Sequence, residues 1–348
     1  MAATLDASTT SPTPGNAPDA RIPLLEVSDL VVEFRQGKNR LLAANHVSLT
    51  VRHGETLGIV GESGSGKSVL CRTILRLLPS PPAFIRSGRV RFGDVDLLTL
   101  TEERMREIRG AHIAMVFQNP MNALNPVWPI GDQVSEGLRV HHGVGQRAAR
   151  ERAIELLAKV GIPSPEVRVD EYPHQWSGGM VQRAVIAMAM VNAPRLILAD
   201  EPTTALDVTI QDQILALLMD LQSRAGMSLV LVSHDMAVVA ETCDRVAVMY
   251  AGRVVELTDT DKIFRNPRHP YTLGLMRSIP RIDGAGGRLE PVQGAPPNLS
   301  TLPPGCPFAP RCPFAQPECR TVEVALREVA PDHFSACLFP ERVDGSMV

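Results

Sequence analysis

The chain has 348 residues, a formal net charge of −3, and 44% hydrophobic and 21% charged residues. At about 150 residues per domain this length predicts two units, and the composition excludes both a mostly disordered chain and a membrane-embedded one. The longest wholly apolar run, Ala184 to Val191, is shorter than the roughly 18 residues that cross a bilayer. Because the charge balance shows no basic excess, we expect no nucleic-acid partner.

The first half of the chain begins irregularly and then carries strands. Residues 1–22 are rich in Ala, Thr, Ser, Pro and Gly, and we expect a disordered tail that is not a signal peptide. From residue 23 onward, apolar spacing predicts strands at 24–34, 46–51 and 56–60, a helix at 67–78, and strands at 88–92 and 112–117. A helical period then dominates from about 120 to 191, broken at 143–145 and 163–173, which predicts an inserted helical subdomain.

Strands return after this insertion. They are predicted at residues 196–199, 228–232 and 245–249, with a helix at 209–223. The alternation predicts an α/β fold with a parallel sheet core, crossover helices and an early antiparallel β subdomain over residues 23–257. Frequent prolines after Leu257 leave room for short helices only, so we expect residues 258–348 to form a small appended unit.

The strongest local signal is a glycine-rich loop between the strand at 56–60 and the following helix. It reads Gly61, Glu62, Ser63, Gly64, Ser65, Gly66, Lys67, Ser68, the G-x-x-x-x-G-K-S pattern of a phosphate-binding loop. Its glycines let backbone N–H groups turn toward one anion, and the helix adds its positive end. We expect Lys67 to reach the outer phosphates of the bound anion and Ser68 to ligate Mg²⁺.

Two acidic residues end the apolar strand at 196–199. Strand ends of an open parallel sheet converge where ligands bind, so Asp200 and Glu201 are expected beside the phosphate loop. Asp200 would hold Mg²⁺ through water, and Glu201 would orient and deprotonate the attacking water.

A serine and two glycines, Ser177, Gly178 and Gly179, precede a helical run that continues to about Val191. Alone they read as an ordinary helix N-cap. The free N–H groups and positive dipole end of such a helix can also hold a γ-phosphate.

Together these motifs resemble the nucleotide-binding subunit of an ABC transporter over about residues 24–257. The matched loops are the signature loop at Ser177, Gly178, Gly179 and Met180, the Q-loop at Gln118, the D-loop at Ala205, Leu206 and Asp207, and the switch histidine at His234. The signature loop differs from the most common sequence of the family at Met180 and Trp176, where Gln and Leu are usual. Met180 is similar to the peptide-importer branch of the family.

The resemblance implies that two such cassettes meet head to tail, so that each ATP lies between the phosphate loop of one and the signature loop of the other. Phe34 would stack on adenine, and Asp207 would touch the opposite cassette. Gln118 would sense Mg²⁺ and contact a membrane subunit, and His234 would hold the γ-phosphate and water. Residues 119–126, which are full of turn formers, are expected to receive a helix of a membrane permease.

The last ninety residues carry a second resemblance. Residues 266–272 and the segment 305–312, followed by two more cysteines, resemble the extension on ATPases of oligopeptide, dipeptide and nickel importers. This resemblance implies a [4Fe–4S] cluster on four cysteine ligands, Cys306, Cys312, Cys319 and Cys337. Five, six and seventeen residues lie between successive cysteines, unlike the tight pairs of zinc ribbons, although Zn²⁺ and free thiols remain alternatives. Cys71 and Cys243 are expected to be buried.

We therefore expect the ATP-hydrolysing subunit of an importer for di- or oligopeptides, held at the cytoplasmic face of the cell membrane. Its expected partners are a second ATPase subunit, two transmembrane permease subunits and an extracytoplasmic solute-binding protein. An importer of nickel or another small solute is the alternative within the same branch. A soluble ABC ATPase of DNA repair or translation and a redox-sensing ATP-binding module are alternatives of other classes.

Overall fold

The structure, a computed structural model, describes residues 23–37, 39–204, 206–278 and 292–343. The expected disordered tail at residues 1–22 lies outside these ranges. Within them, no helix combines the length and the apolar character that crossing a bilayer would require.

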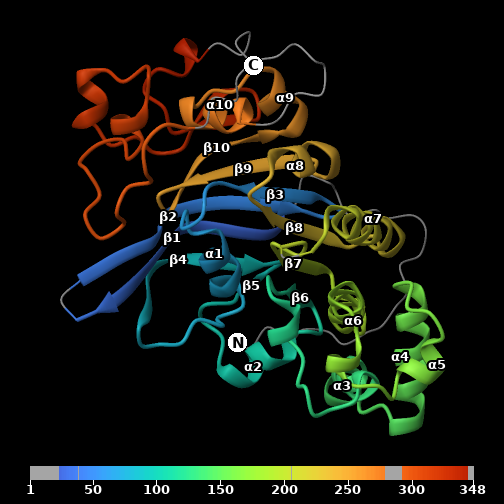
Figure 1. Ribbon diagram of the computed structural model, residues 1–348. Coiled ribbons are helices and arrows are strands. Elements are labelled where there is room, and N and C mark those ends of the chain that lie inside the picture. Colours follow the sequence, from blue (N-terminus) through green and yellow to red (C-terminus); the bar gives the residue numbers. More distant parts are fainter. Residues whose placement is uncertain (1–22, 38, 205, 279–291, 344–348) are drawn as a thin grey trace.

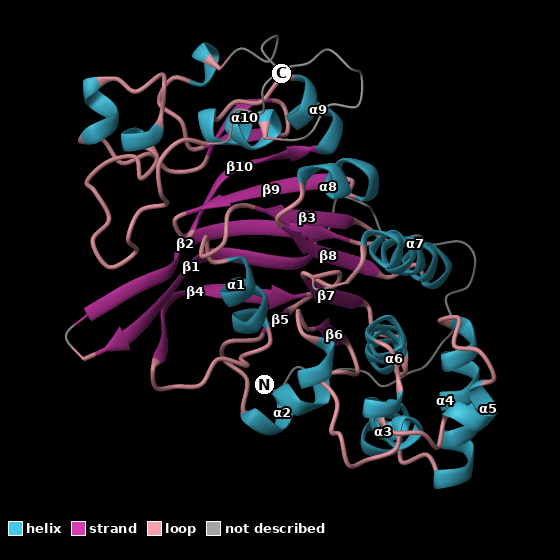
Figure 2. Cartoon of the chain, viewed as in Figure 1, coloured by secondary structure: helices cyan, strands magenta, loops and turns pink. Residues whose placement is uncertain are grey.

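An eight-stranded mixed sheet forms the centre of the molecule (Figures 1 and 2). Its strand order is β11-β12-β10-β9-β3-β8-β7-β6. Five strands run parallel: β3 (Thr56–Val60), β6 (Ile113–Val116), β7 (Leu196–Asp200), β8 (Ser228–Ser233) and β9 (Arg245–Tyr250). Three antiparallel strands extend one edge: β10 (Arg253–Asp259), β12 (His333–Ser335) and β11 (Arg327–Ala330).

A second, antiparallel sheet packs against the first one. Its order is β2-β1-β4-β5, with bounds Pro23–Gln36 for β1, Asn39–Arg52 for β2, Ala83–Phe92 for β4 and Val95–Asp96 for β5. One buried cluster joins side chains of both sheets to helix α1 (Lys67–Ile74), through Leu70 and Cys71 among others. This sheet is the antiparallel β subdomain expected from the sequence.

Helices cover the other face of the central sheet (Figure 2). Alternate residues of β7 separate the two cores: Leu196 and Leu198 face the second sheet, whereas Ile197 and Ala199 face the helices. Covering both faces explains why the parallel strands read as unbroken apolar runs. Helix α2 (Glu102–Ile108) packs on the side of the second sheet instead. The further helices are α3 (Ile130–His142), α4 (Gln146–Lys159), α5 (Pro165–Arg168), α6 (Gly178–Met190), α7 (Val208–Ala225), α8 (Met236–Thr242), α9 (Thr260–Arg265) and α10 (Pro270–Arg277).

Helices α3 to α6 form the helical insertion, at the opposite end of the molecule from the C-terminal segment (Figure 1). The break expected at residues 143–145 separates α3 from α4, where Gly143 adopts φ of 63° after the last residue of α3. This left-handed conformation favours glycine, so the helix ends there.

The C-terminal segment is tied to the sheet more closely than its prolines suggested. The hairpin β11–β12 pairs with β10 through Glu256 opposite Ser335 and Leu257 opposite Phe334. Both strands are only three or four residues long, too short for their alternation to be recognised. The predicted helix at 67–78 likewise ends earlier, at Ile74, and the predicted strand at 88–92 is the second half of β4.

Candidate nucleotide site

The motif residues gather at the carboxyl ends of the parallel strands. The phosphate loop follows β3, Gln118 follows β6, Glu201 follows β7 and His234 follows β8. Ligands of open α/β sheets bind at this edge. Residues separated by more than 170 positions in the sequence are therefore brought to one place by topology alone.

The phosphate loop holds its shape through glycines. Gly61 has φ of 152°, and a Cβ there would lie 2.2 Å from the carbonyl oxygen of Met249. Gly66 has φ of 103° and precedes α1, and its Cβ would lie 2.3 Å from the carbonyl oxygen of Ala43. Each glycine is required both by its backbone conformation and by close backbone neighbours.

Lys67 and Asp200 are buried beside this loop. The Lys67 ammonium donates to the carbonyl oxygens of Gly61, at 2.7 Å, and Glu62, at 3.1 Å. Burial lowers the pKa of Lys67 and raises the pKa of Asp200. Ser68 Oγ donates to Asp200 Oδ1 at 2.7 Å, while the buried Oδ2 has no hydrogen-bond partner among the residues that the structure describes. An unpaired buried carboxylate oxygen next to a serine hydroxyl fits the oxygen ligands of Mg²⁺.

Glu201 is the centre of a small polar network. Its Oε2 accepts hydrogen bonds from Gln118 Nε2 at 3.0 Å and Thr204 Oγ1 at 2.9 Å, and it lies 3.5 Å from His234 Nδ1. Glu201 has φ of 47°, a strained backbone conformation for a residue with a Cβ. Strain of this kind clusters at functional sites, and here it directs the carboxylate to the same edge as the phosphate loop.

An open pocket collects most of the predicted ATP ligands. It is lined by Phe34, the loop residues Ser63 to Ser68, Gln118 and Glu201. His234 lines a small adjoining cavity with Glu201. Phe34 is half-buried at this pocket and offers its ring as one apolar wall.

The signature loop lies outside that pocket. Ser177 caps α6, its Oγ accepting from the N–H of Met180 at 3.4 Å, and Ser177 and Gly178 are exposed. Gly178 and Gly179 pack near Leu206 and Ile210 respectively. Asp207 precedes α7, is exposed, and makes no side-chain capping bond to the described residues; Ala205 of the D-loop lies outside them.

The loop at residues 119–126 contains the turns that its composition predicts. Asn119 caps a 3₁₀ turn, and Asn125 Oδ1 accepts from the N–H of Val127. The exposed hydrophobic residues Met121, Val127 and Trp128 lie on or beside it. This surface remains a predicted permease contact.

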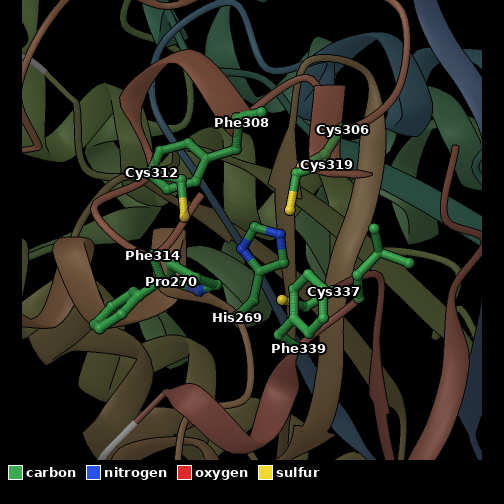
Figure 3. Close-up of a pocket in the computed structure, with 11 residues that line it drawn as sticks. His269, Pro270, Cys306, Phe308, Cys312, Phe314, Cys319, Cys337 and Phe339 are labelled. Carbon is green, nitrogen blue, oxygen red and sulfur yellow. The ribbon is translucent and has the colours of Figure 1, made fainter. Parts of the chain in front are cut away.

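The four C-terminal cysteines line one pocket together with His269 (Figure 3). Each is a free thiol, and burial raises the pKa of Cys312 to about 11 and that of Cys337 to about 12. In the described part of the chain, however, no three or more His, Cys, Asp or Glu side chains form a group that could hold a metal ion. The expected cluster therefore gains no support from metal-site geometry.

Sequence reasoning missed contacts that the C-terminal segment makes with the phosphate loop and its pocket. Arg311 pairs with Glu62, the hydroxyl of Tyr271 accepts from the N–H of Glu62, and Leu299 lines the pocket itself. The Arg311–Glu62 pair joins residues 249 positions apart, and no local pattern marks such a contact.

Known families and proteins resemble this chain over most of its length. A family model described as "ABC transporter" matches residues 44–204, and one described as "Oligopeptide/dipeptide transporter, C-terminal region" matches residues 255–319. A Brucella melitensis protein named as an ATP-binding protein of peptide import is 50% identical over 92% of this chain and 98% of its own length. The oligopeptide transport ATP-binding protein OppD of Mycobacterium tuberculosis is 50% identical over 93% of this chain and 53% of its own length.

Solved structures with the same fold include two dimeric states of the ATP-binding cassette MJ0796. One, a post-hydrolysis state bound to ADP and phosphate, has a TM-score of 0.61 at 28% identity and covers 68% of this chain and 98% of that one. The other, described as a bacterial ABC transporter cassette, has the same TM-score at 29% identity and covers 68% and 98%.

Proposed function

The chain belongs to the ATP-binding cassette family of ABC transporters, and on this premise we propose that it is the ATP-hydrolysing subunit of a membrane importer for di- or oligopeptides. The observation that carries the ATPase assignment is the convergence of the phosphate loop, Gln118 and Glu201 on one pocket. The peptide assignment is supported by the match of residues 255–319 to the oligopeptide/dipeptide transporter C-terminal region.

Hydrolysis on this site is mostly positioning and charge neutralisation. Glu201 acts as general base toward the attacking water, held by the donors of Gln118 and Thr204. His234, close to the same carboxylate, holds the γ-phosphate and the water. Lys67 donates to backbone carbonyls in the structure and turns its ammonium to the outer phosphates when ATP is bound.

Ser68, Asp200 and Gln118 would hold Mg²⁺, which supplies neutralisation of the phosphate oxygens when bound. The unpartnered Oδ2 of Asp200 supports this ligand set. Phe34 would stack on the adenine ring at the apolar wall of the pocket.

The active form is proposed to be a head-to-tail pair of cassettes. The exposed Ser177 and Gly178 at the front of α6 are free to hold the γ-phosphate of an ATP bound to a partner cassette. The MJ0796 cassette, of the same fold, was solved as a dimer with ADP and phosphate. Asp207, also exposed, would contact the partner, and the loop at residues 119–126 would contact a permease.

A reconstituted complex tests the transport proposal. The chain is co-expressed with a second ATPase subunit, two permease subunits and a solute-binding protein encoded beside it, and ATP hydrolysis is measured in proteoliposomes. Addition of di- and oligopeptides is expected to stimulate hydrolysis and drive uptake, whereas nickel complexes are not. Stimulation by nickel alone would move the assignment to a metal importer, and hydrolysis independent of the permeases would favour a soluble machine.

We also propose that Cys306, Cys312, Cys319 and Cys337 hold a [4Fe–4S] cluster, with Zn²⁺ as the alternative. Four thiols on one pocket match the cluster in number and kind of ligand. Backbone N–H groups of Phe308, Phe314 and Phe339, each two residues after a cysteine, are directed at three of the sulfurs. Such hydrogen bonds stabilise thiolate ligands.

Metal analysis of anaerobically purified protein decides between the [4Fe–4S] cluster and Zn²⁺. Four iron and four sulfide per chain with a brown colour are expected. A colourless protein with one zinc per chain, or with no metal at all, would overturn the cluster.

A further inference from the structure

The C-terminal segment reaches the nucleotide pocket as well as the sheet edge. Leu299 is half-buried, packs against the larger hydrophobic core, and lines the pocket together with Phe34 and the phosphate loop. The segment that carries it follows the appended unit's first helices and is remote in sequence from the motifs that define the site. A wall of the candidate ATP site is thus supplied from outside the cassette.

The position of Leu299 is fixed locally by a turn. Asn298 Oδ1 accepts from the N–H of Ser300 at 2.9 Å, and the carbonyl oxygen of Asn298 accepts from the N–H of Thr301 at 3.0 Å. Pro296 and Pro297 stiffen the chain just before this turn. The Leu299 side chain is therefore presented from a constrained backbone.

Arg311 fastens this segment to the phosphate loop. Its guanidinium donates to the carbonyl oxygens of residues 292–294, with distances of 2.8 to 3.1 Å, and to both carboxylate oxygens of Glu62, at 2.7 and 2.9 Å. The Arg311 side chain is only 6% exposed. A buried arginine that forms a bidentate ion pair fixes the positions of its partners more strongly than a lysine could, because its planar guanidinium donates to several acceptors at once.

Tyr271 holds the same loop residue through its backbone. The hydroxyl of this fully buried tyrosine in α10 accepts from the N–H of Glu62 at 2.8 Å. The C-terminal unit therefore restrains Glu62 at both its side chain and its main chain, beside the carbonyl oxygen of the same residue that Lys67 engages.

We propose that residues 292–300 complete the nucleotide site: Leu299 contacts the base or ribose of bound ATP, and Arg311 is a positioning residue that holds both this segment and the phosphate loop. A hydrocarbon side chain offers only apolar contact, which suits the nucleoside rather than the charged phosphates. The inference rests on the proposed ATP site and adds to it a contact from the appended unit.

Leu299→Ala and Leu302→Ala form a matched pair for the test. Both leucines are half-buried against the same core, but only Leu299 lines the nucleotide pocket. Dissociation constants of Mg²⁺–ATP and of inorganic tripolyphosphate are measured on the purified full chain by displacement of a fluorescent ATP analogue. Leu299→Ala should raise the dissociation constant of ATP by roughly five- to fiftyfold, the range for losing three partly to fully buried carbon groups. The dissociation constant of tripolyphosphate should stay within about twofold. Leu302→Ala should leave both within about twofold.

Arg311→Lys keeps the positive charge but loses the bidentate hydrogen bonds of the guanidinium. It should weaken the binding of both ATP and tripolyphosphate, because neither the phosphate loop nor the segment is then held in place. Lys262→Met, which removes a contact between α9 and the carbonyl oxygen of Pro331 remote from the pocket, is its control and should change neither affinity. A purely structural role for Arg311 would lower the thermal midpoint and the active fraction while leaving both dissociation constants unchanged.

A second readout covers the case in which an alanine variant does not fold. The emission of L299W is expected to change on addition of ATP, and that of L302W is not. Equal ATP affinities for Leu299→Ala and Leu302→Ala, or equal responses of L299W and L302W, would overturn the inference while leaving the proposed function intact. Failure of the unsubstituted chain to bind ATP would instead refute the proposed function.

Discussion

Replacement of Glu201 by glutamine separates the chemistry of hydrolysis from the binding of ATP. The substitution preserves shape, and the amide oxygen can still accept from Gln118 Nε2 and Thr204 Oγ1, which lie at 3.0 and 2.9 Å from the carboxylate. What is lost is the ability to take a proton from water. The expected fall in turnover is at least roughly a hundredfold, equivalent to about 2.7 kcal/mol of transition-state stabilisation.

The assay is peptide-stimulated ATP hydrolysis by the complete complex, with ATP affinity measured separately. Affinity is expected to stay within about twofold. Thr204→Val is the matched control: it removes one donor to the same carboxylate and leaves the base, so turnover should fall by no more than about tenfold, the scale of one hydrogen bond. If Glu201→Gln retains turnover within tenfold of the unsubstituted complex, another group is the base and the assignment of Glu201 is wrong.

Three further substitutions test the fold around the site. Arg245→Met leaves the buried Glu55 carboxylate without its charged partner at 3.0 Å, and urea titration should show a loss of about 3–5 kcal/mol in the free energy of unfolding; a loss under about 1 kcal/mol would contradict this. Gly66→Ala places a Cβ 2.3 Å from a backbone carbonyl oxygen, so ATP binding should be abolished, and normal affinity in an equilibrium assay would show that the loop can rearrange. Hydrogen bonds from Arg86 and a neighbouring arginine lower the pKa of Glu33 to about 2, below its ordinary 4.5. That stabilisation is complete above pH 4.5 and lost as pH falls toward 2. The free energy of unfolding of Glu33→Gln should therefore fall less steeply than that of the unsubstituted chain between pH 4.5 and 2, and parallel curves of unfolding free energy against pH would refute the pairing.

The sequence could predict the part of the site that is formed by residues contiguous in the chain. The phosphate loop is recognisable because its glycines, lysine and serine act within eight positions, and the acids after β7 are recognisable because an apolar run ends at them. The parallel topology then brings them together without further information. The expected strands at 56–60 and 196–199 were accordingly confirmed almost to the residue.

Contacts between distant segments could not be predicted in this way. Arg311 reads as one cation in an irregular segment, and nothing near it in the sequence names Glu62 as its partner. Leu299 lies between polar neighbours with no period of two or 3.6, so its approach to the nucleotide pocket depends on packing alone. The hairpin β11–β12 escaped prediction because its strands are too short to show alternation.

The pairing of that hairpin with β10 also bears on how the central sheet avoids aggregation through its edge strand. An uncovered outer strand exposes a row of unsatisfied amide groups that can recruit another chain. Here β12 occupies the outer side of β10, and the terminal strand β11 is only four residues long and carries charged Arg327 and Glu328. A protein shortened before residue 327 would lack the hairpin β11–β12. Strand β10, most of whose residues are buried, would then be an uncovered edge strand, and we expect such a product to precipitate rather than to remain monodisperse.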